Sequence, residues 1–539
     1  MTKQRDKISL LDCTLRDGAY ITESKFGSAA IKGIIEKCQS AGVEIIECGW
    51  LKNDDYRPGT TFYHVPSDLE PYLSGKSRNT VYVVMIDWDR YELDYLPPYD
   101  GKSIDAIRVV FPHGKHRQAV EVGRQIKEKG YQIYFQAANT LAYSDEELTE
   151  LAGEMNRLGI QGLSIVDTFG AMYPEDLERI VHVLNENLDR KVKLGFHSHN
   201  NQQLSFALTM NFIQLLWEEE REVIVDASLC GMGRGAGNAT TELVVSYLNR
   251  KCGCHYDMDS IMDAIDIYME YFTENYHWGY STPYFIAGLY CCHVNNIAYL
   301  LKNHRTNAKD MRNIIESLPA EDRKKYDYDL LEKKYLQNQE LYVDDQAALE
   351  NLSACLKGRE LLLICPGKSS LEEQQTIQRY IQENRPNVLG VNAILQGYNY
   401  DYLFFVSSAR YEYAKATYQR SFEKAERIIL SSVKNVPEGN ERIVGYHHVV
   451  KRGWDYYDNA AICALRLADL LGIEKVTIAG FDSFMMKYNE SYADPFLPTH
   501  SSEDWKAINA EIADMFSDFR KNAVHCREIT FLTPSAFGP

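Results

Sequence analysis

Two short segments in the first half of the chain contain side chains that could bind one divalent cation. Asp17 lies in the Arg-Asp-Gly turn of LLDCTLRDGAY (10–20), and a single residue separates His197 from His199. Residues i and i+2 of a strand point to the same side, so two imidazoles on a strand can reach one ion. A His-x-His pair alone is usually incidental, and the Asp-containing turn adds an independent indication of a metal site.

A glycine-rich segment, GMGRGAGNATTE (231–242), gives a third indication because it contains Asn238. A carboxylate, two imidazoles and an amide oxygen suit six-coordinate Mn²⁺ or Mg²⁺, and Zn²⁺ or Co²⁺ can accept the same set. Two coordination positions would remain for a chelating substrate or water. A fourth polar segment, SIVDTFGAM (164–172), contains Asp167, for which we weigh a catalytic role against a structural one.

The elements that must position these residues are β-branched runs that alternate with helical stretches. We expect eight strands, several of them apolar at successive positions as in strands covered on both faces: 9–14, 44–49, 81–86, 106–112, 132–139, 162–168, 193–199 and 224–230. This α/β pattern predicts a (β/α)8 TIM barrel, whose active sites lie at the carboxyl ends of the strands. An open doubly wound sheet would need a phosphate loop after an early strand, and none is visible there.

The chain has 539 residues, enough for more than one domain. We predict a barrel over 1–255, a helical extension over 256–340 and a smaller Rossmann-like α/β domain over 341–539. In this domain 360–370 is a strand that runs into a Pro-Gly turn, and further strands are expected at 388–392, 401–407 and 475–484. The helix expected at 144–159 opens with a Ser cap and a Glu at the reciprocal position.

Composition excludes several classes of protein. A formal charge of −18 argues against a broad nucleic-acid or anionic-membrane surface. The amino-terminal residues lack the apolar core of a signal peptide, and no long uncharged run reads as a membrane span. We therefore expect a cytoplasmic protein whose 12 cysteines are reduced. We also expect small-molecule substrates and a homo-oligomer.

These motifs, in this order, resemble the metal-dependent aldolase and lyase-synthase superfamily of TIM barrels, which includes hydroxymethylglutaryl-CoA lyase, isopropylmalate synthase, the pyruvate carboxyltransferase domains and 4-hydroxy-2-oxovalerate aldolase. The resemblance covers about residues 7–300 and is closest to the oxovalerate aldolases in the run 167–172. It implies that Asp17, His197 and His199 are metal ligands and Asn238 a weaker fourth.

The resemblance also implies catalytic residues for cleavage of a 4-hydroxy-2-oxo acid through the enolate of pyruvate. Arg16 would stabilise the enolate oxygen, and Glu47 matches an acidic residue at the end of the second strand. Aldolases of this type carry a His where this chain has Tyr20. The general base could therefore be any of four groups: Tyr20, Glu47, His113 or a metal-bound hydroxide. Tyr280 and Tyr284 fall in the region of the family's active-site tyrosine.

The second domain resembles, over short stretches, Rossmann-like domains of surface-polysaccharide proteins. The turn CPGKSS (365–370) lacks the Walker spacing, but such a turn can bind an anion at a helix start. We predict a nucleotide or nucleotide-sugar pocket, with packing or dimerisation as the alternative. The residues that would line this pocket are Gly367, Lys368, Ser369, Asn392 and Asp482.

The sequence thus predicts a divalent-metal-dependent aldolase of sugar-acid or surface-polysaccharide biosynthesis that uses a 2-oxo acid and an aldehyde. One alternative is a Claisen-type synthase that condenses an acyl-CoA with a 2-oxo acid. Another is a non-catalytic binding protein that has kept the metal, which the Tyr at position 20 leaves open.

Overall fold

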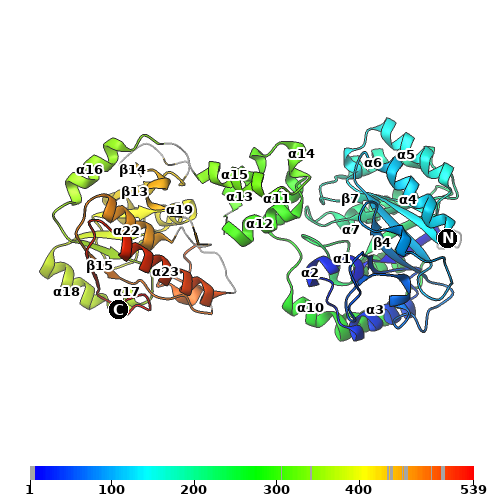
Figure 1. Cartoon of the computed structure of the whole chain (residues 1–539), viewed down its shortest axis with the longest axis horizontal. Coiled ribbons are helices and arrows are strands. Elements are labelled where there is room, and N and C mark those ends of the chain that lie inside the picture. Colours follow the sequence, from blue (N-terminus) through cyan, green and yellow to red (C-terminus); the bar gives the residue numbers. More distant parts are fainter. Residues whose placement is uncertain are drawn as a thin grey trace. The chain divides into compact units, whose positions relative to one another are not determined.

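The chain forms two compact units, which we describe separately (Figure 1). The computed structural model describes residues 7–304, 306, 308–339, 343–433, 436, 441–451, 453–454, 459–486, 488–498 and 504–538. The first unit comprises residues up to Ile297 together with Pro319–Tyr326, and the second comprises Ala298–Leu318 and the chain from Asp327 onward. No helix in the described part of the chain is long and apolar enough to cross a membrane.

The first unit is a closed barrel of eight parallel strands, as the sequence predicts. These are β1 (Ile8–Asp12), β2 (Ile45–Leu51), β4 (Val81–Asp87), β5 (Ala106–Phe111), β6 (Gln132–Ala137), β7 (Gly162–Asp167), β8 (Lys193–Ser198) and β9 (Val223–Ala227). The barrel closes because β1 pairs with both β2 and β9. A short strand, β3 (Phe62–Tyr63), extends the sheet beside β2.

Helices surround most of the barrel: α3 (Ser28–Ala41), α4 (His116–Glu128), α5 (Asp145–Leu158), α6 (Pro174–Asn187), α7 (Ser205–Leu215) and α8 (Thr241–Tyr247). The predicted cap of α5 is confirmed. The Ser144 side chain accepts a hydrogen bond from the amide of Glu147, and the Glu147 side chain accepts one from the amide of Ser144. Two connections depart from regular alternation. In place of a helix, the described chain forms β3 and a 3-10 turn (Pro66–Leu69) between β2 and β4, and a 3-10 turn (Leu93–Tyr95) between β4 and β5.

The barrel interior is layered because alternate residues of each strand point inward. One layer is apolar: Leu11, Ile45, Val83, Ala106, Tyr134 and Ile224. Two residues further along the strands, towards their carboxyl ends, four of the six corresponding positions are charged or amide side chains: Glu47, Arg108, Gln136 and Asp226. The same two-residue period that builds the core therefore places charged groups directly beneath the barrel mouth.

Helices continue after the barrel: α9 (Met258–Ala264), α10 (Glu270–Asn275), α11 (Thr282–Leu289), α12 (Val294–His304), α13 (Ala308–Ser317), α14 (Ala320–Arg323) and α15 (Tyr328–Gln339).

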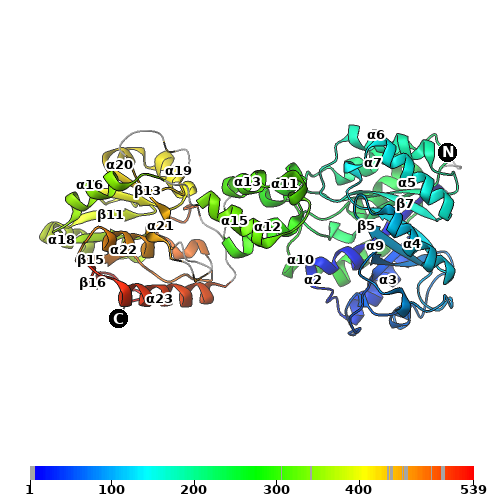
Figure 2. The ribbon, with the colours of Figure 1, turned by 45° about the horizontal axis from the view of Figure 1, so that its top comes forward.

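The second unit contains a parallel sheet of seven strands in the order β14-β13-β12-β11-β10-β15-β16, with helices on both faces (Figure 2). Four strands match the prediction: β10 (Leu361–Ile364), β11 (Asn387–Val391), β12 (Tyr402–Phe405) and β15 (Lys475–Ala479). The sequence reading missed β13 (Glu426–Leu430), β14 (Glu441–Val444) and β16 (Glu528–Phe531). The order reverses between β10 and β15, and sheets of this class bind ligands at such a reversal.

Candidate metal centre and active site

Asp17, His197 and His199 meet at the carboxyl ends of the barrel strands. Asp17 ends α1 (Thr14–Asp17), the single helical turn that follows β1, and is 1% exposed. His197 lies on β8, and His199 follows that strand in an isolated bridge to Asn238. Asp17 Oδ2 lies 3.8 Å from Nε2 of His197 and 3.6 Å from Nε2 of His199. One atom from each of the three side chains can therefore reach a common ion.

The contacts of the two imidazoles turn their free nitrogens towards Asp17. Nδ1 of His197 lies 3.1 Å from Oδ2 of Asp226, and Nδ1 of His199 lies 3.1 Å from the carbonyl oxygen of Asp167. An ionised carboxylate and a carbonyl can only accept hydrogen bonds, so each Nδ1 carries the proton. Both Nε2 lone pairs then face the Asp17 carboxylate, an arrangement that fits a cation and is otherwise repulsive.

Asn238 completes the cluster from the glycine-rich loop. Its Nδ2 donates to Asp17 Oδ2 at 2.6 Å and to the carbonyl oxygen of Met232 at 3.1 Å. Its buried Oδ1 has no hydrogen-bond partner among the described residues. A half-turn of the amide would present Oδ1 on the Asp17 side, where it could serve as the weaker fourth ligand.

Glycine at position 233 permits the close approach of this loop. A Cβ added to Gly233 would lie 2.4 Å from Nδ2 of Asn238 and 2.9 Å from Oδ2 of Asp17. Any side chain at this position would enter the ligand cluster, so the glycine is needed for space.

Buried ion pairs connect this cluster with the polar layer of the barrel. Arg16 Nε donates to Oε2 of Glu47 at 2.7 Å, and Arg16 Nη1 donates to Oδ1 of Asp17 at 2.8 Å. Arg108 Nη1 lies 2.9 Å from the same Glu47 oxygen, and its Nη2 donates to Oδ2 of Asp226 at 2.6 Å. The carboxylates of Asp17, Glu47 and Asp226 thus face the two arginines, which leaves one net negative charge in this group. A divalent cation would make the net charge positive.

The protonation states follow from burial and these charges. Burial alone would raise the pKa of Asp17, but Arg16 and the two imidazoles hold that pKa well below its usual range. Burial lowers the pKa of His199 to about 4, against the opposing effect of Asp17, so its imidazole is neutral. Asp17 is therefore a carboxylate and His199 a neutral imidazole, the forms that bind metals.

A second group of side chains lies beside this cluster: Tyr20, Arg234 and His293. The Arg234 guanidinium carbon lies 3.6 Å from the centre of the Tyr20 ring, and its Nη1 is 3.4 Å from Nε2 of His293. The Tyr20 residue is 42% exposed, yet burial of its hydroxyl raises its pKa above the ordinary value. Burial and the neighbouring Arg234 lower the pKa of His293 to about 3. Tyr20 is therefore a phenol and His293 a neutral imidazole at neutral pH.

The other residues predicted for the barrel site have varied surroundings. Glu47 is fully buried between the two arginines. Burial raises the pKa of Asp167 to about 7, and its carboxyl accepts from the amides of the loop after β7. Tyr280 is 62% exposed ahead of α11, and Tyr284 lies in the first turn of that helix, where burial raises its pKa.

His113, one of the bases considered, has its Nε2 3.0 Å from the Glu147 carboxylate at the start of α5. This pairing gives the imidazole a structural partner on the outer helices.

The five residues predicted to line a pocket in the second unit separate into two sets. Gly367, Asn392 and Asp482 line a cavity of about 340 Å³ at the carboxyl ends of the sheet. Lys368 is exposed and Ser369 is buried, and neither lines that cavity.

Four residues of the barrel site were missed by the sequence reading: Arg108, Asp226, Arg234 and His293. A signal was present for two of them, because Arg108 and Asp226 are charged residues at inward positions of apolar strands. No local pattern distinguishes Arg234 or His293, which reach Tyr20 from distant parts of the chain.

Comparison with known proteins finds relatives of the first unit. Residues 113–267 match a family model described as HMGL-like. The chain is 28% identical over 278 residues to 4-hydroxy-2-oxovalerate aldolase 2 of Salinispora arenicola, covering 50% of this chain and 76% of that protein. It is 26% identical over 272 residues to oxaloacetate decarboxylase of Mycobacterium tuberculosis, covering 49% and 77%.

Among solved structures, hydroxymethylglutaryl-CoA lyase from Pseudomonas aeruginosa is 17% identical with a TM-score of 0.39, covering 48% of this chain and 91% of that one. The family model and the curated relatives support the predicted resemblance of the first unit to the HMGL-like aldolases and lyases.

Proposed function

We propose that the first unit is a divalent-metal-dependent carbon–carbon lyase that cleaves a 4-hydroxy-2-oxo acid to pyruvate and an aldehyde, or joins them in the reverse direction. The observation that carries this proposal is the orientation of His197 and His199, whose Nε2 lone pairs both face Asp17. Such a site would hold Mn²⁺ or Mg²⁺, with Zn²⁺ or Co²⁺ also suited to the ligands. When bound, the cation would act as a Lewis acid towards the 2-oxo group.

Arg16 would supply a second positive charge at the same oxygen. Glu47 and Asp17 hold its guanidinium from two sides, and the indole nitrogen of Trp50 donates to its carbonyl oxygen at 3.1 Å. A charge fixed in this way needs no reorganisation as the enolate forms, which is how preorganised sites stabilise developing negative charge.

Proton transfer at the C4 hydroxyl would fall to the group formed by Tyr20, Arg234 and His293. His293 is a neutral imidazole whose Nδ1 accepts from the amide of Asn295 at 3.1 Å, so proton uptake there requires this hydrogen bond to open, whereas the Tyr20 phenol can donate a proton. We do not assign this role to Glu47, because Arg16 and Arg108 both contact its Oε2 and pair this carboxylate with two cations. Within the proposal, His293 therefore takes the role of the histidine that oxovalerate aldolases have at the position corresponding to Tyr20.

The decisive experiment is exchange of the pyruvate methyl protons into deuterated water, followed by NMR, with Mn²⁺ or Mg²⁺ and with chelator. It reports enolate formation and does not depend on the identity of the aldehyde. We expect metal-dependent exchange that is lost in Asp17→Asn and Arg16→Ala and kept in Arg190→Ala, an exposed control whose partner is Glu219. Exchange that survives chelator or persists in Asp17→Asn would contradict the proposal.

Two other activities are distinguished by further substrates. Decarboxylation of oxaloacetate passes through the same pyruvate enolate, so release of CO₂ from oxaloacetate must be compared with cleavage of 4-hydroxy-2-oxo acids. A Claisen-type synthase would release free thiol from acetyl-CoA in the presence of a 2-oxo acid. A loaded metal without any exchange would favour a binding protein that has kept the metal.

A further inference from the structure

The cavity of about 340 Å³ in the second unit lies at the reversal of strand order between β10 and β15. Its walls come from the residues that follow the sheet strands, including Gly367 after β10, Asn392 after β11 and Asp482 after β15. Its size is that of a site for a small organic ligand.

The Pro-Gly-Lys-Ser turn at this end of the sheet is already satisfied by the chain itself. Asp482 accepts from the amide of Ser369 at 2.8 Å and also from the Ser369 hydroxyl. A Cβ added to Gly367 would lie 2.6 Å from Oδ2 of Asp482, so the carboxylate lies directly against this turn. An external anion would have to displace Asp482 in order to bind here.

The start of α22 (Ala460–Leu470), which also lines the cavity, is satisfied in the same way. The side-chain oxygen of Asn459 accepts from the amides of Ala461 and Ile462 at 3.1 and 3.2 Å. This helix therefore has its own cap.

The start of α19 (Ser408–Thr417) also lies at this cavity. Its first turn, residues 407–410, lines the cavity, and the N-cap residue Ser407 makes no side-chain cap. The first amides of a helix have no partner within the helix and carry the positive end of its dipole, so they suit an anion.

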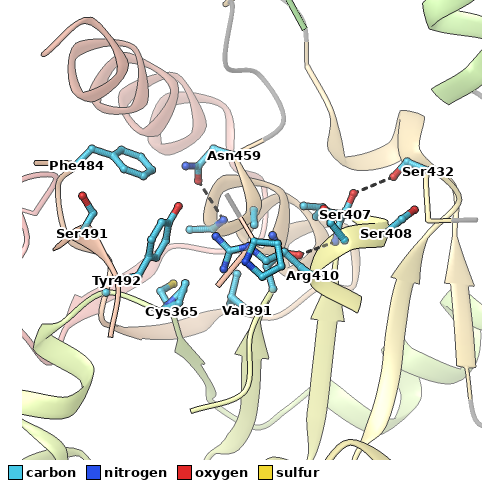
Figure 3. A pocket seen from close by; sticks show the side chains of 18 of the residues that line it. Cys365, Val391, Ser407, Ser408, Arg410, Ser432, Asn459, Phe484, Ser491 and Tyr492 are labelled. Atoms are coloured by element: carbon cyan, nitrogen blue, oxygen red, sulfur yellow. Dashed lines mark hydrogen bonds between the residues drawn. The ribbon is translucent and has the colours of Figure 1, made fainter. Parts of the chain in front are cut away.

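Arg410 adds a cationic side chain to this turn (Figure 3). It is 6% exposed, and its buried Nη1 has no hydrogen-bond partner among the described residues. Its guanidinium carbon lies 4.7 Å from the centre of the Tyr492 ring, a contact that holds the group without neutralising its charge. Of the described residues lining the cavity, Arg410 is the only Lys or Arg.

We propose that this cavity binds an organic phosphate, with the phosphate held by Arg410 and the first amides of α19. A guanidinium and a helix start on one wall match phosphate oxygens. The remaining walls offer carboxylates, amides and hydroxyls, at Asp310, Asn392, Asn459 and Ser432 among others. Groups of this kind bind the hydroxyls of a sugar, so the shared chemistry is that of a nucleotide or a sugar phosphate.

The test is isothermal titration of the full chain with uridine 5′-diphosphate, glucose 1-phosphate, inorganic phosphate and uridine. We expect at least one organic phosphate to bind more tightly than inorganic phosphate, and uridine to bind far more weakly than its diphosphate. The stronger of the two organic phosphates identifies the source. Equal binding of inorganic and organic phosphate, equal binding of uridine and its diphosphate, or no binding of either organic phosphate would overturn the proposal.

Variants separate a binding role from a structural one. Arg410→Gln should weaken binding about tenfold or more, and Arg420→Gln, an exposed arginine on α20 (Gln419–Lys424), should leave it unchanged. Among the described residues, Arg410 contacts the Tyr492 ring and leaves its Nη1 unpartnered, so its replacement breaks no buried ion pair there and should not lower the thermal midpoint. Undiminished affinity in Arg410→Gln would contradict the assignment.

A second pair of variants tests the helix start without touching the arginine. Ser408→Pro removes the first amide at a position where proline is compatible with a helix, and Ser408→Ala retains that amide. We expect weaker binding in Ser408→Pro than in Ser408→Ala. These readouts involve no turnover, so they stand or fall independently of the lyase activity proposed for the first unit.

Discussion

Asp226 lies 3.1 Å from Nδ1 of His197, on the side of the imidazole opposite the nitrogen that faces Asp17. Arg108 holds the Asp226 carboxylate through a 2.6 Å hydrogen bond, and the effect of this arginine and of His197 outweighs burial and lowers the pKa of Asp226. The carboxylate therefore stays ionised and fixes both the tautomer and the orientation of His197.

The first prediction follows from this contact. Asp226→Asn should weaken metal binding by about 10–100-fold, the usual cost of losing a partner that orients a ligating histidine. The measurement is titration of the apoprotein with Mn²⁺, monitored by electron paramagnetic resonance. Asp55→Asn, an exposed aspartate in the β2–β3 loop, is the matched control. Unchanged Mn²⁺ affinity in Asp226→Asn would show that the contact is dispensable.

A second prediction concerns Glu47, which lies between two buried arginines. Glu47→Ala would leave Arg16 and Arg108 without their shared carboxylate, and breaking a buried ion pair costs about 3–5 kcal/mol. We expect the free energy of unfolding in urea to fall by that order. In Glu47→Gln the free energy of unfolding should fall less, because the glutamine side chain can still accept a hydrogen bond from Arg16. A variant that unfolds like the parent but loses activity would instead assign Glu47 a direct catalytic role.

Gly233 provides a test of space in the metal site. Gly233→Ala would place a Cβ 2.4 Å from Nδ2 of Asn238, so we expect the loop to shift and Mn²⁺ affinity to fall by an order of magnitude or more. Gly75→Ala is the control because no atom lies within 4 Å of its added Cβ. If both variants bind Mn²⁺ equally well, the close approach of the glycine loop is not required.

The proton-transfer group gives a fourth prediction. His293→Ala should lower aldol cleavage by about 10²–10⁴-fold, the range for loss of an acid–base group, while leaving Mn²⁺ affinity unchanged. Tyr20→Phe keeps the ring beneath Arg234 and removes only the hydroxyl, so its effect isolates the phenol. Pyruvate proton exchange should be measured alongside cleavage. The exchange reports enolate formation alone, whereas cleavage also requires proton transfer at the C4 hydroxyl, so the two assays separate these steps. Full cleavage activity in His293→Ala would exclude this histidine as the base.

The pH dependence of the same reaction follows from the sign of the His293 shift. Its pKa is lowered to about 3, so the unprotonated form that accepts a proton is fully present above that value and is lost only as pH falls through it. We therefore expect no decline in cleavage rate from protonation of His293 between pH 8 and 5. An acidic limb with a midpoint near 6.5 that disappears in His293→Gln would contradict this expectation.

The barrel, and the three side chains that meet at its mouth, could be predicted from the sequence. Parallel strands buried on both faces read as apolar runs, and all eight barrel strands were found from that signal. The proximity of Asp17, His197 and His199 could be predicted because the carboxyl ends of barrel strands converge, whatever their separation in the chain. In the second unit the strands missed include β14 and β16, which lie at the two edges of the sheet and are partly exposed.

The tertiary structure alone decided which polar groups are already satisfied. Local patterns show that Ser369 opens a helix, but not that Asp482, far along the chain, fills that turn. Likewise, Arg234 reaches both Tyr20 and His293 only because the barrel mouth and the start of α12 pack together. The alternation of residues along a strand predicts which side of the sheet a side chain faces. The hydrogen-bond or ion-pair partner of that side chain depends instead on how segments remote in sequence pack together, and no local sequence pattern predicts this packing.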